Sequence, residues 1–201
     1  MVATCSIRKR WASSGSIITP SGGRLSYRTE RVRPQPTRMS RMSARSVALN
    51  ALRRWRQEND RADAIIARSF VETTLSAADR AFALELFYGV LRNLTLLDFW
   101  IAQLRRPHVD AGLRDVLRLG LYQLFLLKTP DHAAVNETVG LASTRGRELI
   151  NAVLRAAIRR RNELRSRAAA QPLSVRQSHP QFLIARWEGN FGAETAEALC
   201  R

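Results

Sequence analysis

The sequence predicts an all-α fold. From Ser43 onward, apolar residues recur at spacings of three and four, which is the period of one face of an α-helix. No segment alternates between apolar and polar residues, as a half-buried strand would. The connections between the periodic segments are short, and proline marks several of them. We therefore expect a compact bundle of about seven helices.

The helices can be placed one by one from their apolar stripes and their boundary residues. Ser76 and Asp79 have the spacing of a capping box, which predicts a helix start at this point. Pro107 and Pro130 end the fourth and fifth helices. The fifth is the most apolar, and we expect it at the centre of the core. The expected helices cover Ala44 to Trp55, Asp60 to Thr74, Ser76 to Val90, Leu94 to Leu104, Leu113 to Lys128, Pro130 to Ala142 and Leu149 to Ile158.

Two of these segments place an asparagine beside an apolar stripe, where Ala or Leu would be the better helix former. Asn136 follows Val135 and precedes Val139, and Asn151 follows Ile150. A buried amide without a partner costs on the order of 1–3 kcal/mol, so each asparagine needs hydrogen-bond partners. We interpret the two as a polar tie between core helices, with direct contact to a ligand as the alternative.

The charge of the chain is strongly positive and is carried almost entirely by arginine. Arg and Lys number 33 against 17 Asp and Glu, a formal net charge of +16, and only Lys9 and Lys128 are lysines. A planar guanidinium can donate two hydrogen bonds at once to a phosphate or a base edge. An arginine-biased genome explains Arg over Lys, but not the excess over acidic residues. We therefore expect a polyanionic partner, and nucleic acid is the commonest.

No residue pattern is typical of a catalytic or metal site. Cys5 and Cys200 lie at opposite ends of the chain, which fits a reducing compartment and leads us to expect a cytoplasmic protein. His108, His132 and His179 are isolated, and the sequence contains no Gly-x-Gly turn of the kind that holds a nucleotide-like cofactor. No apolar run reaches the roughly 18–20 residues that span a bilayer. We therefore assign no catalytic residue, cofactor site or metal, and expect no membrane partner.

Residues 1–43 differ from the rest of the chain in composition. They contain nine basic residues and one acidic residue, Glu30, with scattered Ser, Gly and Pro and no apolar period. Such a segment cannot bury enough apolar surface to compensate the entropy of ordering, so we expect a disordered basic tail. A start codon assigned too early, with Met39 or Met42 as the true first residue, is our preferred explanation. A transit peptide and a flexible arm that binds RNA are the alternatives.

Five short motifs occur in a fixed order from about Arg45 toward the C-terminus. They are Asp79-Arg80, Glu85-Leu86-Phe87-Tyr88-Gly89-Val90-Leu91-Arg92, Leu119-Gly120-Leu121-Tyr122-Gln123-Leu124, Asn136-Glu137 and Asn151-Ala152-Val153-Leu154-Arg155. Together they resemble the NusB-like domain, a small helical RNA-binding fold. That domain stands alone in the antitermination factor NusB, and it forms the front of RsmB-type (Sun, Fmu) ribosomal RNA cytosine-5 methyltransferases. The ending at Arg155 is similar to the methyltransferase version. The connection from Ala142 to Leu149 is shorter than this family usually has.

The resemblance implies two small helical subdomains and RNA binding by basic residues near the start of the domain. Arg45 matches the family's early arginine, and Arg80 and Arg92 stand in family motifs, although Arg92 could instead pair with Asp98. The resemblance also marks three residues as structural motif positions: Asn136, Glu137 and Asn151.

Two groups of arginines are candidates for RNA contacts. On the first helix, Arg45, Arg53 and Arg56 fall within roughly an 80° arc, whereas Arg54 points elsewhere. A solvated helix face is the alternative for this group. The second group repeats like charges at i and i+4, an arrangement that is unfavourable without an anion, and only Glu163 offers local relief. Favourable placement of cations near the C-terminal end of a helix would account for Arg165 and Arg167, but not for Arg155. This group comprises Arg155, Arg159, Arg160, Arg161, Arg165 and Arg167.

We expect three parts in the chain: the tail at 1–43, a helical RNA-binding domain at 44–168, and a segment at 169–201. In the last part, Ser178 is expected to cap a helix that has Pro180 in its first turn, and Gly192 precedes another helix. This part resembles the entry to the methyltransferase region of RsmB-type enzymes.

Three functions follow as hypotheses. The first is an RNA-binding domain, with ribosomal RNA as partner, from the front of an S-adenosylmethionine-dependent ribosomal RNA (cytosine-5) methyltransferase. In that case the cofactor is expected only for a catalytic domain outside this chain. The second is a stand-alone antitermination factor that acts with RNA and a small ribosomal protein. The third is a helical protein-interaction module whose arginines only increase solubility.

Overall fold

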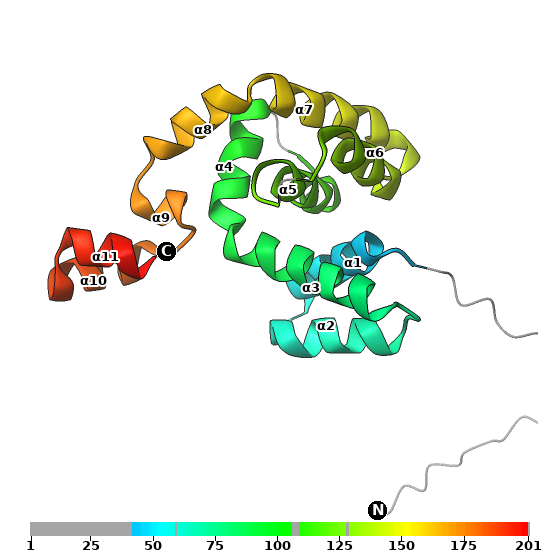
Figure 1. The fold of residues 1–201 in the computed structure, drawn as a ribbon, viewed down its shortest axis with the longest axis horizontal. Helices are drawn as coiled ribbons and strands as arrows, with labels where there is room; N and C mark the ends of the chain where they lie inside the picture. The colour runs from blue at the N-terminus through cyan, green and yellow to red at the C-terminus, as the bar shows by residue number, and fades with distance from the viewer. Residues whose placement is uncertain (1–41, 59, 106–108, 128, 201) are drawn as a thin grey trace, which may run out of the picture. The chain divides into compact units, whose positions relative to one another are not determined.

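Helices account for nearly all of the described residues, which are 42–58, 60–105, 109–127 and 129–200 in this computed structural model (Figure 1). No strand occurs within these ranges, and the all-α prediction is confirmed. The tail expected over residues 1–43 lies outside the described residues except for Met42 and Ser43. The helices are α1 Ala44–Gln57, α2 Ala62–Val71, α3 Ala77–Arg92, α4 Leu94–Leu104, α5 Ala111–Phe125, α6 Asp131–Leu141, the 3₁₀ helix η1 Thr144–Gly146, α7 Arg147–Arg159, α8 Arg161–Ala169, α9 Leu173–Arg176, α10 Gln181–Phe191 and α11 Ala193–Leu199.

Serine side chains fix the starts of two early helices. Ser43 Oγ accepts a hydrogen bond from the backbone N–H of Ser46 at 3.2 Å and so caps α1. Ser76 Oγ accepts from the backbone N–H of Asp79 at 3.1 Å and donates to Asp79 Oδ2 at 2.7 Å. The capping box predicted at the start of α3 is therefore confirmed, and such a cap contributes on the order of 1 kcal/mol.

The helices form two groups that meet at α5. Helices α1, α2 and α3 pack against one another, as do α4 to α8, and α5 contacts both α1 and α3 of the first group. Figure 1 shows α5 between α4 and α6. Leu117, Leu119 and Leu121 of α5 are fully buried, together with Phe87 of α3 and Leu154 of α7. The expectation that the most apolar helix is central is confirmed.

One buried carboxylate joins α1, α4 and α5. The side chain of Asp115 is only 2% exposed, and it accepts hydrogen bonds from Arg56 Nε at 3.0 Å and Arg118 Nη1 at 3.0 Å. Arg118 also makes a two-bond pair with Asp98 on α4, at 2.8 and 2.7 Å. Burial by itself lowers the pKa of Arg118, but the bonds to Asp98 and Asp115 outweigh it, so the pKa is raised. The charges are thus matched inside the core.

A buried amide makes a second polar junction, between α1, α5 and α6. Gln123 is fully buried; its Oε1 accepts from Arg45 Nε at 2.7 Å, and its Nε2 donates to Thr138 Oγ1 at 3.2 Å and to the carbonyl of Leu119 at 3.1 Å. Since Arg45 meets Gln123 and Arg56 meets Asp115, α1 and α5 run antiparallel. Hydrogen bonds therefore fix the register between these two helices in addition to apolar packing.

A close approach between α3 and α5 depends on the absence of a side chain at Gly89. A Cβ atom placed on Gly89 would lie 2.1 Å from Cζ of Tyr122, so the tyrosine ring occupies this space. The Tyr122 hydroxyl donates a short hydrogen bond to Glu85 one turn earlier on α3. Burial and this bond raise the pKa of Tyr122 to about 12.

The segment after α8 contains three helices, where we expected a polar linker followed by two. The extra one is the single turn of α9, which contacts α4 and α8. The prediction that Ser178 caps α10 is wrong, because Pro180 occupies the N-cap position. Ser178 instead has a positive φ of 55°, and its Oγ accepts from the backbone N–H of Leu96 at 3.0 Å. It therefore caps the first turn of α4, which Asn93 leaves without a side-chain cap.

We predict that Asp115→Ala lowers the free energy of unfolding by about 3 kcal/mol, because it leaves Arg56 without its partner and Arg118 with only one. The matched control is Asp63→Ala, which removes an exposed partner of Arg61 and should cost less than about 1 kcal/mol. Urea denaturation followed by circular dichroism measures both. Equal, small losses would contradict a structural role for Asp115.

The raised pKa of Tyr122 predicts a loss of stability at high pH. An unfolded tyrosine ionises near pH 10.0 and the folded one near 12, so the stabilisation is complete below pH 10 and is lost as the pH rises to 12. The stability difference between the wild type and Tyr122→Phe should shrink by about 2 kcal/mol over this range. Urea titrations at several pH values measure it, and a constant difference would contradict the prediction.

Candidate nucleic-acid interface

The arginines of α1 lie as predicted, but most of them bind within the fold. Arg45, Arg53 and Arg56 all face α5, whereas Arg54 makes a two-oxygen pair with Glu72 beyond the end of α2. Arg54 is thus separated from Arg45 and Arg56, as predicted, but not from Arg53, which lines a second hollow together with Arg54 and Glu72. Whether these residues bind RNA stays a prediction.

Arg45 and Arg56 hold the two helix groups together. The side chain of Arg45 is 19% exposed; its guanidinium carbon lies 5.0 Å from the ring centroid of Phe82, and its Nη1 lies 3.9 Å from Glu137 Oε2. Arg56 is committed to Asp115. Substitution of either residue would therefore change stability as well as any binding of an anion.

Arg53 has no hydrogen-bond or ion-pair partner among the described residues and lines a hollow of about 300 Å³. Residues at the start of α5, including the carboxylate of Asp110, and residues of the η1 connection line the rest of the hollow. One of them is Arg145, which is exposed and has no partner within the described part. A Cβ at Gly146 would meet Leu113 at 2.4 Å, so glycine allows η1 to lie this close to α5. The short connection after Ala142 thus places the guanidinium of Arg145 in the wall of the hollow that Arg53 also lines.

Arg145 was missed by sequence reasoning. It lies 92 positions after Arg53 in the chain, and only the packing of α1, α5 and η1 brings the two together. The run Thr144-Arg145-Gly146-Arg147 in a short connection was the available signal. Both guanidiniums lie near the N-terminal end of α5, where the helix dipole adds positive potential, although the capping carboxylate of Asp110 offsets part of it.

The second arginine group is divided by a break in the helix. Helix α7 ends at Arg159 and α8 begins at Arg161, so the group does not form one continuous face. Four members bind within the described fold: Arg160 and Arg167 to Glu163, Arg161 to Asp131, and Arg165 to the carbonyl of Phe125. The bond from Arg160 lowers the pKa of Glu163, which keeps this carboxylate charged.

Only Arg155 and Arg159 of this group bond to neither an acidic residue nor a backbone carbonyl among the described residues. Both are exposed, and Arg155 Nε donates to Asn151 Oδ1 at 2.9 Å. Of the six arginines predicted to form this surface, Arg155 and Arg159 therefore remain the candidates for RNA contacts.

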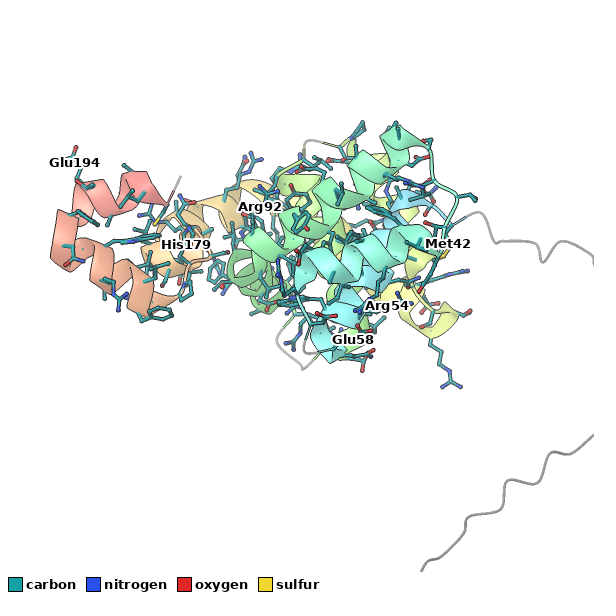
Figure 2. The ribbon with its side chains drawn as sticks, turned by 90° about the horizontal axis from the view of Figure 1, so that it is seen from below. Met42, Arg54, Glu58, Arg92, His179 and Glu194 are labelled. Carbon is teal, nitrogen blue, oxygen red and sulfur yellow. The ribbon has the colours of Figure 1, made fainter. Side chains whose placement is uncertain are left out.

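Arg80 and Arg92 are exposed on α3, and neither has an acidic partner within the described residues. The guanidinium of Arg80 lies 5.9 Å from the ring centroid of Phe70, and Arg92 Nε donates to the carbonyl of Tyr88 at 3.3 Å. The alternative pairing of Arg92 with Asp98 is wrong, because Arg118 occupies that carboxylate. Figure 2 shows Arg92 apart from Arg54 of α1.

The asparagines do not form the expected tie between core helices. Asn136 is exposed and Asn151 is half-buried, and no hydrogen bond joins them. Our premise of burial was wrong, because the apolar stripes on α6 and α7 bury neighbouring positions and leave the amides at their edges. Both amides instead line a groove between α6 and α7, together with Arg155. Glu137, the third motif residue, faces Arg45.

The remaining polar candidates are accounted for by packing. His179 packs edge-on against Trp187, His132 lies at the α6–α7 groove, and His108 lies outside the described residues. Cys200 is buried, and burial raises the pKa of its thiol, which disfavours a nucleophilic thiolate. Within the described ranges, no three His, Cys, Asp or Glu side chains are grouped as metal ligands. No helix of that part has both the length and the apolarity needed to cross a membrane.

Comparison with known proteins agrees with this architecture. The NusB family model matches residues 42–159, which contain α1 to α7. The chain is 34% identical over 173 residues to the probable ribosomal RNA small subunit methyltransferase B of Bacillus subtilis, covering 81% of this chain and 38% of that protein. The protein of the same name in Synechocystis is 34% identical over 169 residues, with 79% and 38% covered.

A third relative, ribosomal RNA small subunit methyltransferase B of Pseudomonas putida, is 39% identical over 129 residues, which cover 61% of this chain and 29% of that protein. The chain therefore spans less than two fifths of the length of these relatives. Since the family model covers more than half of the chain, the chain belongs to the NusB family.

Proposed function

We propose that the folded part of this chain binds ribosomal RNA, mainly through phosphates, and that the hollow between Arg53 and Arg145 is the central contact. The observation that supports it is that both guanidiniums line one hollow and neither has an acidic partner among the described residues, although the capping carboxylate of Asp110 also lines it. Most other arginines of the described part bind within the fold. Two unpaired cations in one hollow can both donate to a phosphate placed there.

We further propose that the domain holds RNA for a ribosomal RNA (cytosine-5) methyltransferase. The relatives that align over most of this chain carry the name of such an enzyme, and the alignment with the Bacillus protein covers 81% of the chain. Methyl transfer and the binding of S-adenosylmethionine would then belong to a catalytic portion outside these residues. Such a protein would act in the cytoplasm, where bacterial ribosomal RNA is made.

Antitermination together with a ribosomal protein remains the second function, because the NusB family model covers α1 to α7. Recovery of an RNA-dependent complex with a ribosomal protein would favour this function. Methylation of small-subunit RNA by the longer protein would favour the first.

We predict that binding of a labelled ribosomal RNA hairpin weakens steeply with salt. The plot of log affinity against log salt should have a slope of about −0.7 to −0.9 for each neutralised phosphate. Arg53→Ala and Arg145→Ala should each weaken binding several-fold and reduce the size of the slope by about one contact. Fluorescence anisotropy at several salt concentrations measures both.

The matched control is Arg61→Ala, because Arg61 is 83% exposed, also carries one positive charge, and pairs with Asp63. It should leave affinity and slope nearly unchanged. Absence of binding at low salt, or equal losses for Arg61→Ala and Arg53→Ala, would contradict the proposed contact. Arg45→Ala is unsuitable as a test, because it also removes the bond to Gln123.

A further inference from the structure

Helices α10 and α11 form a pair that is joined to the preceding helices by one short turn. Ile184 of α10 and Ala196 of α11 are buried, and the two helices pack against each other. Toward the rest of the domain, α10 packs on α9, and α9 in turn packs on α4 and α8. An ion pair crosses the same junction, from Arg176 Nη1 of α9 to Glu197 Oε1 of α11 at 3.3 Å. The placement of the pair on the domain therefore depends on the turn between α9 and α10.

Backbone freedom in this turn is concentrated at Ser178. Pro180 has a φ of −58° that its ring fixes, and a residue that precedes proline, as His179 does, is restricted to extended conformations. The ring of His179 also packs edge-on against Trp187 of α10, with 5.6 Å between centroids, so it would move with α10. Ser178 has a φ of 55° and is the one residue other than glycine with a positive φ in the described part. Such a backbone lowers the population of a non-glycine residue roughly five- to thirty-fold.

A hydrogen bond to another helix compensates for this unfavourable backbone. Ser178 Oγ accepts from the backbone N–H of Leu96 in the first turn of α4 at 3.0 Å, and Asn93 gives that turn no side-chain cap. A serine cap raises the population of the capped state by about five-fold, so this gain is similar in size to the cost at Ser178. The junction also contains a buried Nε of Arg176 without a hydrogen-bond partner among the described residues. The observed placement of α10 is therefore balanced between opposing effects.

We propose that Ser178 is a hinge about which α10 and α11 rotate together, and that its hydrogen bond to Leu96 holds this hinge closed. When the bond breaks, Ser178 returns to a negative φ, and α4 loses its cap at the same time. Because Pro180 and the residue before it are restricted, the change at Ser178 is passed on to the whole pair and is not absorbed within the turn. The hinge goes beyond the proposed function and does not depend on it, since no candidate RNA contact takes part.

Three substitutions of Ser178 in the full chain separate the hydrogen bond from the backbone cost. Ser178→Ala removes the cap and keeps the backbone cost, so the ratio of open to closed hinge should rise about five-fold. Ser178→Gly also removes the cap, but glycine adopts a positive φ freely, so the ratio should stay the same or fall. Ser178→Asn retains a side-chain acceptor and tolerates a positive φ, so the ratio should fall. Ser166→Ala, at an exposed serine of α8, is the matched control and should change nothing.

The distance between spin labels on α8 and α10 measures the position of the hinge. Asn162 and Asn190 are exposed, and Asn162→Cys with Asn190→Cys provides the labelling sites in a Cys5→Ser background, because Cys200 is buried. Double electron–electron resonance then gives the distribution of distances between the two labels. A second distance should appear or grow in Ser178→Ala, whereas Ser178→Gly should keep the wild-type distribution.

Amide hydrogen exchange measured by NMR tests the hydrogen bond by itself. Exchange at the Leu96 N–H should accelerate by at least about five-fold in Ser178→Ala and Ser178→Gly, because both remove the acceptor, and not in Ser178→Asn. Equal distance distributions in the wild type and Ser178→Ala would overturn the hinge, as would equal displacement of α10 in Ser178→Ala and Ser178→Gly. Unchanged exchange at Leu96 in Ser178→Ala would overturn the role of the hydrogen bond. Circular dichroism establishes that each variant is folded.

Discussion

The carboxylate of Asp115 is the interaction on which the arrangement of the helices depends. It is buried in α5, where an unpaired charge would be strongly unfavourable, and Arg56 from α1 and Arg118 from α5 neutralise it. Arg118 in turn is fixed by Asp98 of α4. The paired charges fix the register of α1 along α5 in addition to apolar packing. The bond between Arg45 and Gln123 fixes the same register at the other end of α1.

This constraint separates the arginines into two classes that composition cannot distinguish. Arg56 and Arg118 are part of the core junction, and Arg160, Arg161 and Arg167 are paired at the surface. The net charge of +16 therefore overstates the number of unpaired positive charges that a partner could contact. Guanidiniums without an acidic partner among the described residues remain at the hollow lined by Arg53 and Arg145, along α7, and at Arg80 and Arg92 of α3. A polyanion that bridges these places would contact elements from the two helix groups.

The Arg53–Arg145 hollow and the α6–α7 groove offer different chemical groups to a partner. The Arg53–Arg145 hollow offers charge without base-specific groups, so it suits phosphates and should depend strongly on salt. The α6–α7 groove offers the amides of Asn136 and Asn151 beside apolar side chains. Helix α6 and the η1 connection lead directly from one to the other, because η1 carries Arg145 and joins the two helices of the groove. A domain of this kind would position RNA for chemistry performed elsewhere.

The sequence by itself determined α1 to α7, their order, the Ser76 capping box and the central place of α5, because periodicity and capping depend on residues within a few positions of one another. It also separated Arg54 from Arg45 and Arg56, since helix geometry fixes angles along one element. Only the tertiary structure decided which arginines are bound and which are free. Asp98 pairs with Arg118 and not with Arg92, Ser178 caps α4 and not α10, and Arg145 lines the same hollow as Arg53. Each of these arrangements joins residues 20 or more positions apart. Local pattern carries no information about such contacts, because they depend on how whole helices pack.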